Sequence, residues 1–131
     1  MRVLIVDDSK IVCERLQQVL INIADVEIVG QANNAQDAIA SISESKPDVV
    51  ILDIRLPGLN GIDVLKDIRA KKLPIQVIML TNYPYPQYRK KCEELGAEYF
   101  FDKVTEIAAL PDVIEALAKN KPEELSYRQI P

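Results

Sequence analysis

The chain has 131 residues, of which 48% are hydrophobic and only 4 are glycine and 8 proline, a composition that suits one globular domain. Its formal net charge of −4 comes from 20 acidic and 16 basic residues that are mixed along the chain, so the sequence carries no basic region for nucleic acid or for an anionic membrane. Histidine is absent, which excludes histidine metal sites, a Ser-His-Asp triad and a phosphohistidine on this chain.

The first part of the chain alternates twice between a strand-like run and a helical stripe. Short runs rich in β-branched residues predict strands at Val3–Val6 and Val26–Gln31. Apolar residues at helical spacing follow each run. They predict one helix marked by Val12, Leu16, Val19, Leu20 and Ile23, and a second marked by Ala35, Ala38, Ile39 and Ile42.

The rest of the chain repeats this alternation. Strands are predicted at Val49–Leu52, Gln76–Leu80 and Glu98–Phe101. A helix from about Pro86 to Leu95 has proline in its first turn and Gly96 placed to end it. The helical stripes on either side of it consist of Ile62, Leu65 and Ile68, and of Ile107, Leu110, Val113, Ile114 and Leu117, where Pro111 is expected to delay the regular helix.

Strands that are apolar on both faces need helices on both sides, which indicates a parallel sheet with right-handed crossovers. The predicted fold is therefore α/β, a (βα)5 doubly wound parallel sheet, and the flavodoxin-like strand order 2-1-3-4-5 is favoured. In that order the first and third strands are neighbours. Functional groups in such sheets gather beyond the carboxyl ends of the strands, where the strand order reverses.

Polar residues stand at these strand ends. Asp7 and Asp8 follow the first predicted strand, Asp53 follows the third, Thr81 the fourth, and Lys103 lies just beyond the fifth. A lone aspartate at a strand end is usually a helix cap or a turn residue, but three that converge across one crevice indicate a site. Clustered carboxylates need a compensating cation, and their hard oxygen ligands favour Mg²⁺.

These residue types suit phosphoryl transfer. The ammonium of Lys103 can pair with an incoming anion, and the hydroxyl of Thr81 can donate a hydrogen bond to it. Phosphoryl transfer depends mainly on positioning and on neutralising charge, which a carboxylate, a divalent cation, a lysine and a hydroxyl can provide. Asp53 is the predicted nucleophile, which would form an aspartyl phosphate.

Four segments carry a resemblance to a known family. "VDD" at 6–8, "LDIRLPGLNG" at 52–61, "MLTN" at 79–82 and "YFFDK" at 99–103 resemble the receiver domain of two-component response regulators. The resemblance implies a stand-alone receiver domain over residues 1–119, followed by a C-terminal tail at 120–131 and no output domain. A receiver fragment of a longer response regulator is the alternative.

The resemblance also implies a role for each site residue. Asp53 is similar to the phosphoacceptor, which takes its phosphoryl group in a Mg²⁺-dependent reaction. Asp8 resembles the direct Mg²⁺ ligand, with Asp7 acting through water, and the backbone carbonyl of Arg55 is implied as a further ligand. The implied donor is a phosphohistidine on a sensor histidine kinase or on a histidine phosphotransfer domain.

Thr81 and Lys103 are implied to hold the phosphoryl oxygens, and Phe100 resembles an aromatic switch residue that swings inward after phosphorylation. The switch would alter the face formed by the fourth helix, fifth strand and fifth helix, and so the binding of a downstream protein. A homodimer through that face is compatible with the resemblance. Such a domain catalyses only its own phosphorylation and dephosphorylation, so a dedicated turnover enzyme is not expected.

The chain departs from the family pattern at two positions beside the site. Asn82 follows Thr81 where the family has a small residue, which is expected to alter access to Asp53. Val104 stands where the family commonly has proline, so the geometry of the peptide bond before it is open. The resemblance further implies that Arg55 and Tyr83 influence the lifetime of the phosphoryl group.

A group of aromatic and basic residues lies on the presumed output face, formed by Tyr83, Tyr85, Tyr88, Arg89 and Lys90. One interpretation is a proline-stiffened loop with locally packed tyrosines and a solvated basic helix face. The other is a partner-binding surface, because tyrosine and arginine are enriched at interfaces.

Cys13 and Cys92 lie far apart and match no metal-ligand spacing, so we expect two reduced, mostly buried thiols. The apolar run Val3–Val6 is too short for the core of a signal peptide. These features predict a cytoplasmic protein that binds neither a membrane nor nucleic acid.

Three rival functions remain weaker. A haloacid dehalogenase-type phosphatase needs a second aspartate two residues after the nucleophile, where this chain has Arg55. A flavin or nucleotide module is disfavoured because no glycine-rich loop follows the first predicted strand. A receiver that signals without phosphate is disfavoured because all the acidic, hydroxyl and amino groups are present.

Overall fold

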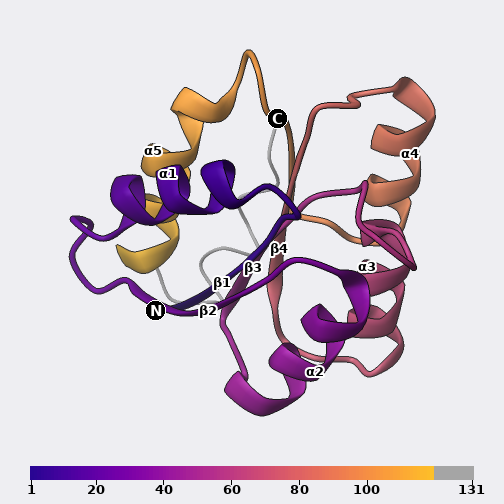
Figure 1. The fold of residues 1–131 in the computed structure, drawn as a ribbon, viewed down its shortest axis with the longest axis horizontal. Coiled ribbons are helices and arrows are strands. Elements are labelled where there is room, and N and C mark those ends of the chain that lie inside the picture. Colours follow the sequence, from indigo (N-terminus) through magenta and orange to yellow (C-terminus); the bar gives the residue numbers. More distant parts are fainter. Residues whose placement is uncertain (120–131) are drawn as a thin grey trace.

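The computed structural model describes residues 1–119. Five parallel strands form one sheet in the order β2-β1-β3-β4-β5 (Figure 1). The strands are β1 (Arg2–Val6), β2 (Glu27–Ala32), β3 (Val49–Leu52), β4 (Gln76–Thr81) and β5 (Tyr99–Asp102). The predicted fold and strand order are confirmed, and each strand end lies within about one residue of its prediction. The predicted C-terminal tail, 120–131, lies outside the described residues.

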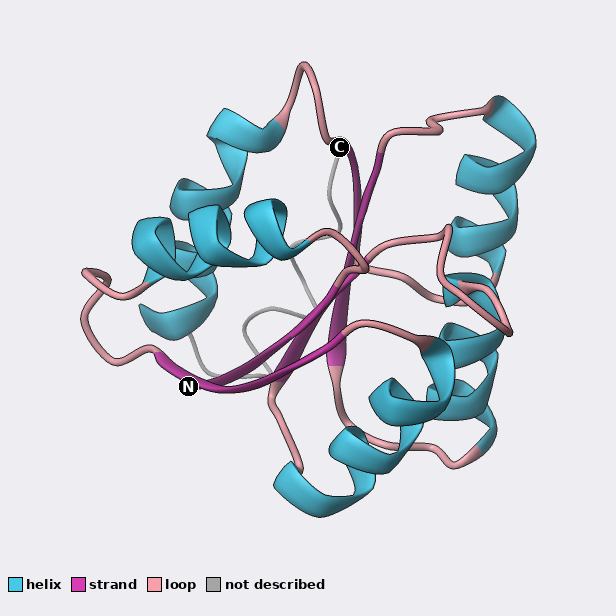
Figure 2. Ribbon diagram, in the orientation of Figure 1, coloured by secondary structure: helices cyan, strands magenta, loops and turns pink. Residues whose placement is uncertain are grey.

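Helices cover both faces of the sheet (Figure 2). They are α1 (Lys10–Leu20), α2 (Ala35–Ser45), α3 (Gly61–Ala70), α4 (Pro86–Glu94) and α5 (Leu110–Lys119), with a short 3-10 helix at Ile107–Ala109 before α5. Helices α1 and α5 lie on one face, and α2, α3 and α4 lie on the other (Figure 1). Among the described residues no helix is both long enough and apolar enough to cross a bilayer.

Two predicted helix boundaries have the expected physical basis. Gly96, just after α4, adopts a positive φ of 86°, a conformation that glycine reaches without steric cost. Pro111 occupies the first turn of α5, where a missing N–H is tolerated, and the chain before it forms only the 3-10 helix. Regular helix therefore begins next to Pro111, as predicted.

Side-chain caps start the two helices that follow β1 and β3, the strands whose ends carry the aspartates. The Ser9 hydroxyl accepts a hydrogen bond from the Val12 N–H at the start of α1, at 3.3 Å. Asn60 and Asp63 form a reciprocal capping box at the start of α3, with both hydrogen bonds at 3.1 Å. The caps fix where the chain turns away from the sheet.

The core consists of two layers, one on each face of the sheet. Strand β3 is buried throughout, with Val50 and Leu52 in one layer and Val49 and Ile51 in the other, as expected for a central parallel strand. Cys13 and Cys92 are both buried and free, which confirms their prediction, and burial raises the pKa of Cys92 to about 11.

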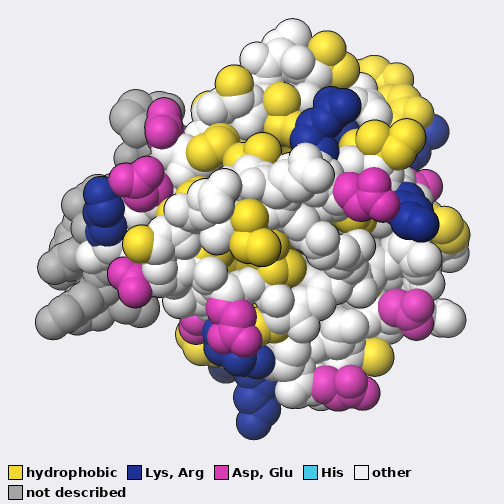
Figure 3. All heavy atoms as spheres, turned by 60° about the vertical axis from the view of Figure 1, so that its left-hand side comes forward, with side chains coloured by type: hydrophobic (Ala, Val, Ile, Leu, Met, Phe, Trp, Pro, Cys, Tyr) yellow, Lys and Arg dark blue, Asp and Glu magenta, His cyan; other side chains and the backbone are white. Residues whose placement is uncertain are grey.

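On the face that carries α1 and α5, charged side chains of both signs are interspersed among hydrophobic ones (Figure 3). Exposed apolar side chains on α1 include Ile11 and Val19. The mixture of charges along the sequence is therefore also a mixture in space on this face, which agrees with the lack of a basic region.

At the opposite edge from the strand ends of the site, Arg69 of α3 connects segments that are distant in sequence. Its guanidinium donates to the Ile75 carbonyl at 2.9 Å, to the Gly96 carbonyl at 2.7 Å and to the Glu98 carboxylate at 2.9 Å. Glu98 in turn accepts from the Val77 N–H at 2.7 Å. The cluster connects the C-terminal end of α3 to the segments just before β4 and β5.

Replacing Arg69 with methionine is expected to lower the free energy of unfolding by about 2 kcal/mol, because the partly buried Glu98 loses its cation and two carbonyls lose a donor. Lys71→Met is the matched control, since the Lys71 side chain is exposed and its i,i+4 ion pair with Asp67 should contribute less than about 0.5 kcal/mol. Urea denaturation of both variants measures the difference. A loss of unfolding free energy in Arg69→Met as small as the loss expected for Lys71→Met would show that the Arg69 cluster does not stabilise the fold.

Candidate functional site

The register of the sheet brings the aspartates together. Val6 of β1 pairs with Leu52 of β3, so Asp7 and Asp53 both lie one residue beyond the paired ends of adjacent strands. The Asp53 N–H donates to the Val6 carbonyl at 3.0 Å, which extends the pairing into the site. The predicted neighbourhood of the first and third strands is the direct cause of this proximity.

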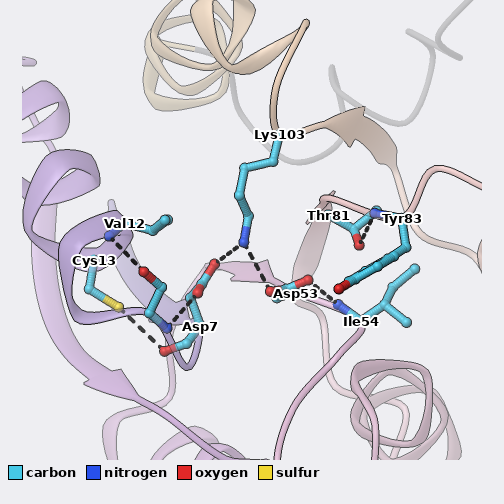
Figure 4. Close-up of polar contacts among 9 residues, drawn as sticks. Asp7, Val12, Cys13, Asp53, Ile54, Thr81, Tyr83 and Lys103 are labelled. Carbon is cyan, nitrogen blue, oxygen red and sulfur yellow. Dashed lines mark hydrogen bonds and ion pairs between the residues drawn. The ribbon is translucent and has the colours of Figure 1, made fainter.

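Four charged groups meet at this edge of the sheet. Oxygen atoms of Asp7, Asp8 and Asp53 lie within 4.8 Å of one another. The Lys103 Nζ atom lies 2.6 Å from Asp7 Oδ2 and 2.9 Å from Asp53 Oδ2 (Figure 4). Asp7, Asp53 and Lys103 are buried and Asp8 is exposed. The predicted convergence is observed, and Lys103 bridges two of the carboxylates.

Backbone N–H groups hold the buried carboxylates on their other oxygens. The Ser9 N–H donates to Asp7 Oδ1 at 2.8 Å, and the Ile54 N–H donates to Asp53 Oδ1 at 2.7 Å (Figure 4). Within residues 1–119, each buried side-chain nitrogen or oxygen atom has a hydrogen-bond partner. The orientation of the Asp53 carboxylate is therefore set from both sides, by Ile54 and by Lys103.

Burial and charge act in opposite directions on the pKa values in this cluster. Burial raises the pKa of Asp53 above its usual range, and the charge and hydrogen bond of Lys103 oppose that rise only in part. Burial acts to lower the pKa of Lys103, but its hydrogen bonds to Asp7 and Asp53 and their charges outweigh it, so the pKa is raised. The lysine is thus held as a cation. Beside it lies the carboxylate of Asp53, whose charged form is destabilised by burial and is stabilised by any nearby positive charge.

Thr81 stands at the end of β4 and is fully buried. Its hydroxyl oxygen accepts a hydrogen bond from the Tyr83 N–H at 3.0 Å (Figure 4). Its carbonyl accepts one from the Lys103 N–H at 2.7 Å. Thr81 therefore joins the loop after β4 to the residue that contacts Asp53. Its predicted role in holding phosphoryl oxygens stays a prediction.

The two positions expected to influence phosphoryl lifetime contact each other. The Arg55 guanidinium lies over the Tyr83 ring, 4.1 Å from its centroid, a cation–π geometry that joins the loops after β3 and β4. Both Arg55 and the neighbouring Asn82 are exposed. The metal-binding role predicted for the Arg55 carbonyl is untested, as is the effect of Asn82 on access.

The predicted switch residue Phe100 is half-buried against the core layer under α4. The Arg89 guanidinium lies over its ring at 4.5 Å and donates to its carbonyl at 3.3 Å. The tyrosines contact one another in turn, with ring centroids 6.1 Å apart for Tyr83 and Tyr85 and 5.5 Å apart for Tyr85 and Tyr88. Local packing of the tyrosines is thus observed.

Lys90 is exposed on α4, as is Arg89. Partner binding by these residues and the tyrosines stays a prediction.

The peptide bond between Lys103 and Val104 is trans, as are all peptide bonds of the described residues. Valine at this position is therefore accommodated without a cis peptide bond.

Gly61 is a site residue that sequence reasoning missed. A Cβ atom at this position would lie 1.9 Å from the Asp53 carbonyl oxygen and 2.8 Å from its carbonyl carbon. The Gly61 N–H donates to the Ile54 carbonyl at 2.7 Å. Glycine is therefore required where α3 begins, because the backbone there lies against that of Asp53 and Ile54. The sequence shows only that a glycine follows the Asn60 cap, which does not indicate how closely α3 approaches Asp53.

The donor set fits the predicted magnesium ion. Mg²⁺ prefers hard oxygen ligands and binds through one or two carboxylates while it keeps several waters. The three grouped carboxylates provide such oxygens, and the exposed Asp8 gives the cluster a side that faces solvent. Their combined negative charge exceeds the single positive charge of Lys103, so the excess charge favours the binding of a further cation.

Known proteins share this sequence and architecture. The chain is 32% identical over 92% of its length to an uncharacterized transcriptional regulatory protein, YvfU, of Bacillus subtilis, and it spans 60% of that relative. It is 34% identical over 78% of its length to a protein-glutamate methylesterase/protein-glutamine glutaminase of Clostridium acetobutylicum, and it spans 30% of that relative. The chain thus covers less than two thirds of either relative.

Solved structures of response regulators have the same fold as this chain. A LuxR-family DNA-binding response regulator from Staphylococcus aureus superposes with a TM-score of 0.82 and 32% identity, over 89% of this chain and 98% of that one. The isolated receiver domain of RcsB from Salmonella enterica gives a TM-score of 0.84 at 28% identity, over 97% and 96%. A chain of the CheX-CheY-BeF3-Mg complex from Borrelia burgdorferi gives a TM-score of 0.81 at 28% identity, over 89% of this chain and 88% of that one.

A family model decides the assignment. The model that describes the response regulator receiver domain matches residues 3–115, which include all of the clustered site residues and all five strands except Arg2, the first residue of β1. The chain therefore belongs to the receiver domain family of two-component response regulators.

Proposed function

We propose that this receiver domain accepts a phosphoryl group on Asp53 in a Mg²⁺-dependent reaction and that phosphorylation changes how its α4-β5-α5 face binds a partner. The observation that supports the proposal best is the position of the Asp53 carboxylate. It is buried, lies 2.9 Å from the Lys103 ammonium, and is grouped with the oxygens of Asp7 and Asp8. A carboxylate nucleophile beside a cation-binding cluster is the arrangement that aspartyl phosphate formation requires.

Asp53 is the nucleophile in this proposal. Each of its carboxylate oxygens has one hydrogen-bond donor, Ile54 N–H or Lys103 Nζ, so each keeps a lone pair for attack. A carboxylate oxygen forms a bond to phosphorus while the bond between phosphorus and the donor's imidazole nitrogen breaks. The electron pair of the broken bond leaves with the imidazole.

Lys103 and Thr81 hold the transferred group. The Lys103 ammonium turns from the carboxylates toward a phosphoryl oxygen, and its flexible stem allows this without movement of the backbone. The Thr81 hydroxyl, which accepts from the Tyr83 N–H, has its own proton free to donate to a second phosphoryl oxygen. Both residues thus neutralise or bind charge that arrives with the phosphoryl group.

Asp8 and Asp7 are the proposed holders of Mg²⁺, Asp8 directly and Asp7 through water, together with Asp53 and the Arg55 carbonyl. Bound Mg²⁺ supplies positive charge that offsets the carboxylates and the phosphoryl oxygens. The chain's own contribution is the fixed position of Asp7 and Asp53, each held by a backbone N–H and by Lys103.

The output of the switch passes through Thr81 and Phe100. Movement of the Thr81 hydroxyl toward the phosphoryl group opens space that the half-buried Phe100 ring fills, and the ring then leaves its contact with Arg89 of α4. A surface that contains Tyr85, Tyr88 and Lys90 changes as a result, and a downstream protein or a second copy of the domain reads that change.

The proposed donor is a phosphohistidine of a histidine kinase or a phosphotransfer domain. The similar CheX-CheY complex contains BeF3 and Mg, which supports both the phosphoryl site and the metal proposed for this chain. The domain turns over only its own phosphoryl group and is not a dedicated enzyme in this proposal. Its free, buried cysteines suit a reducing compartment, so the proposed location is the cytoplasm.

Incubation with Mg²⁺ and acetyl phosphate is expected to add one phosphoryl group to the wild-type chain and none to Asp53→Asn. The variant keeps an oxygen that can accept from the Ile54 N–H but lacks the nucleophilic carboxylate. Intact-mass spectrometry detects the adduct, and EDTA is expected to abolish it. Asp48→Asn, which lies outside the cluster, is the control and should be phosphorylated normally.

An adduct that persists in Asp53→Asn would place the phosphoacceptor elsewhere. Sustained hydrolysis of unrelated phosphate esters by the wild-type chain would favour a phosphatase instead.

A further inference from the structure

Lys103 is carried by the turn between β5 and α5, residues 102–106. The backbone closes this turn, because the Glu106 N–H donates to the Asp102 carbonyl at 2.8 Å. At the same point the Lys103 N–H donates to the Thr81 carbonyl at 2.7 Å. The Cα atom of Lys103 is therefore attached to β4 on one side and to a closed turn on the other.

Two carboxylates complete the turn. Asp102 Oδ1 accepts from the Val104 N–H at 2.8 Å and from the Thr105 N–H at 3.4 Å. Glu106 Oε1 accepts from the Asp102 N–H at 2.9 Å. Without these acceptors, backbone donors on both sides of Lys103 would lose their partners and turn to solvent.

Val104 provides the backbone N–H for one of these side-chain bonds. Proline, which the family commonly has at this position, restricts the backbone but has no N–H to donate. Val104 lacks that restriction, and its side chain is exposed, so packing does not hold it. Its N–H instead donates to Asp102, a bond that proline could not make.

We propose that Asp102 and Glu106 are positioning residues that hold Lys103 at Asp53 in place of the stiffness that a proline would provide. The catalytic consequence of this inference rests on the proposed function, whereas the positioning itself does not. A lysine side chain has many rotamers, so the location of its ammonium depends on how firmly its backbone is held.

Glu106 has a second contact that could explain its presence. Its Oε1 atom lies 3.8 Å from Arg89 Nη2, and both side chains are more than 40% exposed. An ion pair that is exposed and long contributes little. The cap on the Asp102 N–H is therefore the interaction that positions Lys103, and glutamine, which keeps an acceptor oxygen but no charge, separates the two contacts.

The first experiment measures the position of Lys103 without any phosphorylation. Acetylation by N-hydroxysuccinimidyl acetate, followed by peptide mass spectrometry, reports how accessible each lysine is, and the buried Lys103 should react slowly in the wild type. Asp102→Ala and Glu106→Ala are expected to speed its acetylation by about three- to tenfold, the range that one lost hydrogen bond gives. Asp102→Asn and Glu106→Gln should stay near the wild-type rate.

Glu94→Ala is the matched control, since it removes an exposed carboxylate on α4, and it should leave Lys103 unchanged. Acetylation of Lys66, exposed on α3, should be equal in every variant and normalises the amount of reagent, while circular dichroism shows that the fold is intact. Unchanged acetylation of Lys103 in both alanine variants would overturn the inference. So would glutamine and asparagine variants that react as fast as the alanine ones.

The second experiment measures the initial rate of phosphorylation over a range of acetyl phosphate concentrations. The alanine variants are expected to lose about three- to tenfold in maximal rate, while the half-saturating donor concentration stays unchanged. The reason is that the Lys103 ammonium stabilises the phosphoryl group during its transfer, and a displaced ammonium no longer does so. The amide variants should recover most of the loss. Full maximal rates in the alanine variants would overturn the inference, whereas a wild type that accepts no phosphoryl group overturns the proposed function alone.

Discussion

Replacement of Gly61 by alanine is expected to lower the free energy of unfolding by about 3 kcal/mol or more and to abolish normal phosphorylation of Asp53. The added Cβ would lie 1.9 Å from the Asp53 carbonyl oxygen and 3.0 Å from the Ile54 Cα atom. Both neighbours are backbone, so no side chain can move aside. Either α3 shifts outward or the segment that carries Asp53 is displaced; both outcomes lower the stability and change the position of Asp53.

Urea denaturation and the acetyl phosphate assay measure the two effects. Gly30→Ala is the matched control, because a Cβ there would meet only the Leu4 Cδ1 atom at an ordinary 3.6 Å. Its stability should change by less than about 1 kcal/mol. A Gly61→Ala variant as stable and as readily phosphorylated as Gly30→Ala would show that the start of α3 yields easily.

Replacement of Lys103 by methionine is expected to destabilise the domain by about 3 kcal/mol at neutral pH without Mg²⁺. The substitution leaves Asp7 and Asp53 buried beside each other without the ammonium that now lies 2.6 Å and 2.9 Å from them. Mg²⁺ should then raise the melting temperature of the variant more than that of the wild type, because the cation replaces the missing charge. Lys66→Met, at an exposed position of α3, is the control.

The same variant has an expected pH dependence. Burial already raises the pKa of Asp53, and loss of Lys103 removes the main opposing influence, so the pKa rises further. A raised pKa in the folded state means that folding favours the protonated carboxyl, so this contribution is present at low pH and is lost as pH rises through the folded value. The deficit of Lys103→Met should therefore shrink on acidification from neutral pH.

Melting curves between neutral pH and about pH 5 measure this trend, above the ordinary carboxyl pKa of about 4. In the wild type the raised pKa of Lys103 keeps the ammonium charged throughout that range, so its ion pairs persist. A deficit that stays constant over the range would mean that the carboxylates are hydrated, and not buried as charges, once the lysine is removed.

The position of the site follows from local sequence patterns. The runs at Val49–Leu52 and Val77–Leu80 are apolar without alternation, which indicates strands buried on both faces and hence a parallel sheet. Once the strands are parallel, their carboxyl ends share one edge. The sequence alone therefore placed Asp7, Asp53 and Lys103 near one another, because burial periodicity and chain direction are local properties.

The tertiary structure decided which atoms meet. The sequence suggested that Lys103 would face an incoming anion, whereas the fold places its ammonium between two carboxylates, one of them 96 residues away. The approach of Gly61 to Asp53 and the hold of Asp102 and Glu106 on Lys103 also emerged only from the fold. Such contacts depend on strand register, helix placement and side-chain rotamers fixed jointly by the packed chain, and no local pattern of residues encodes them.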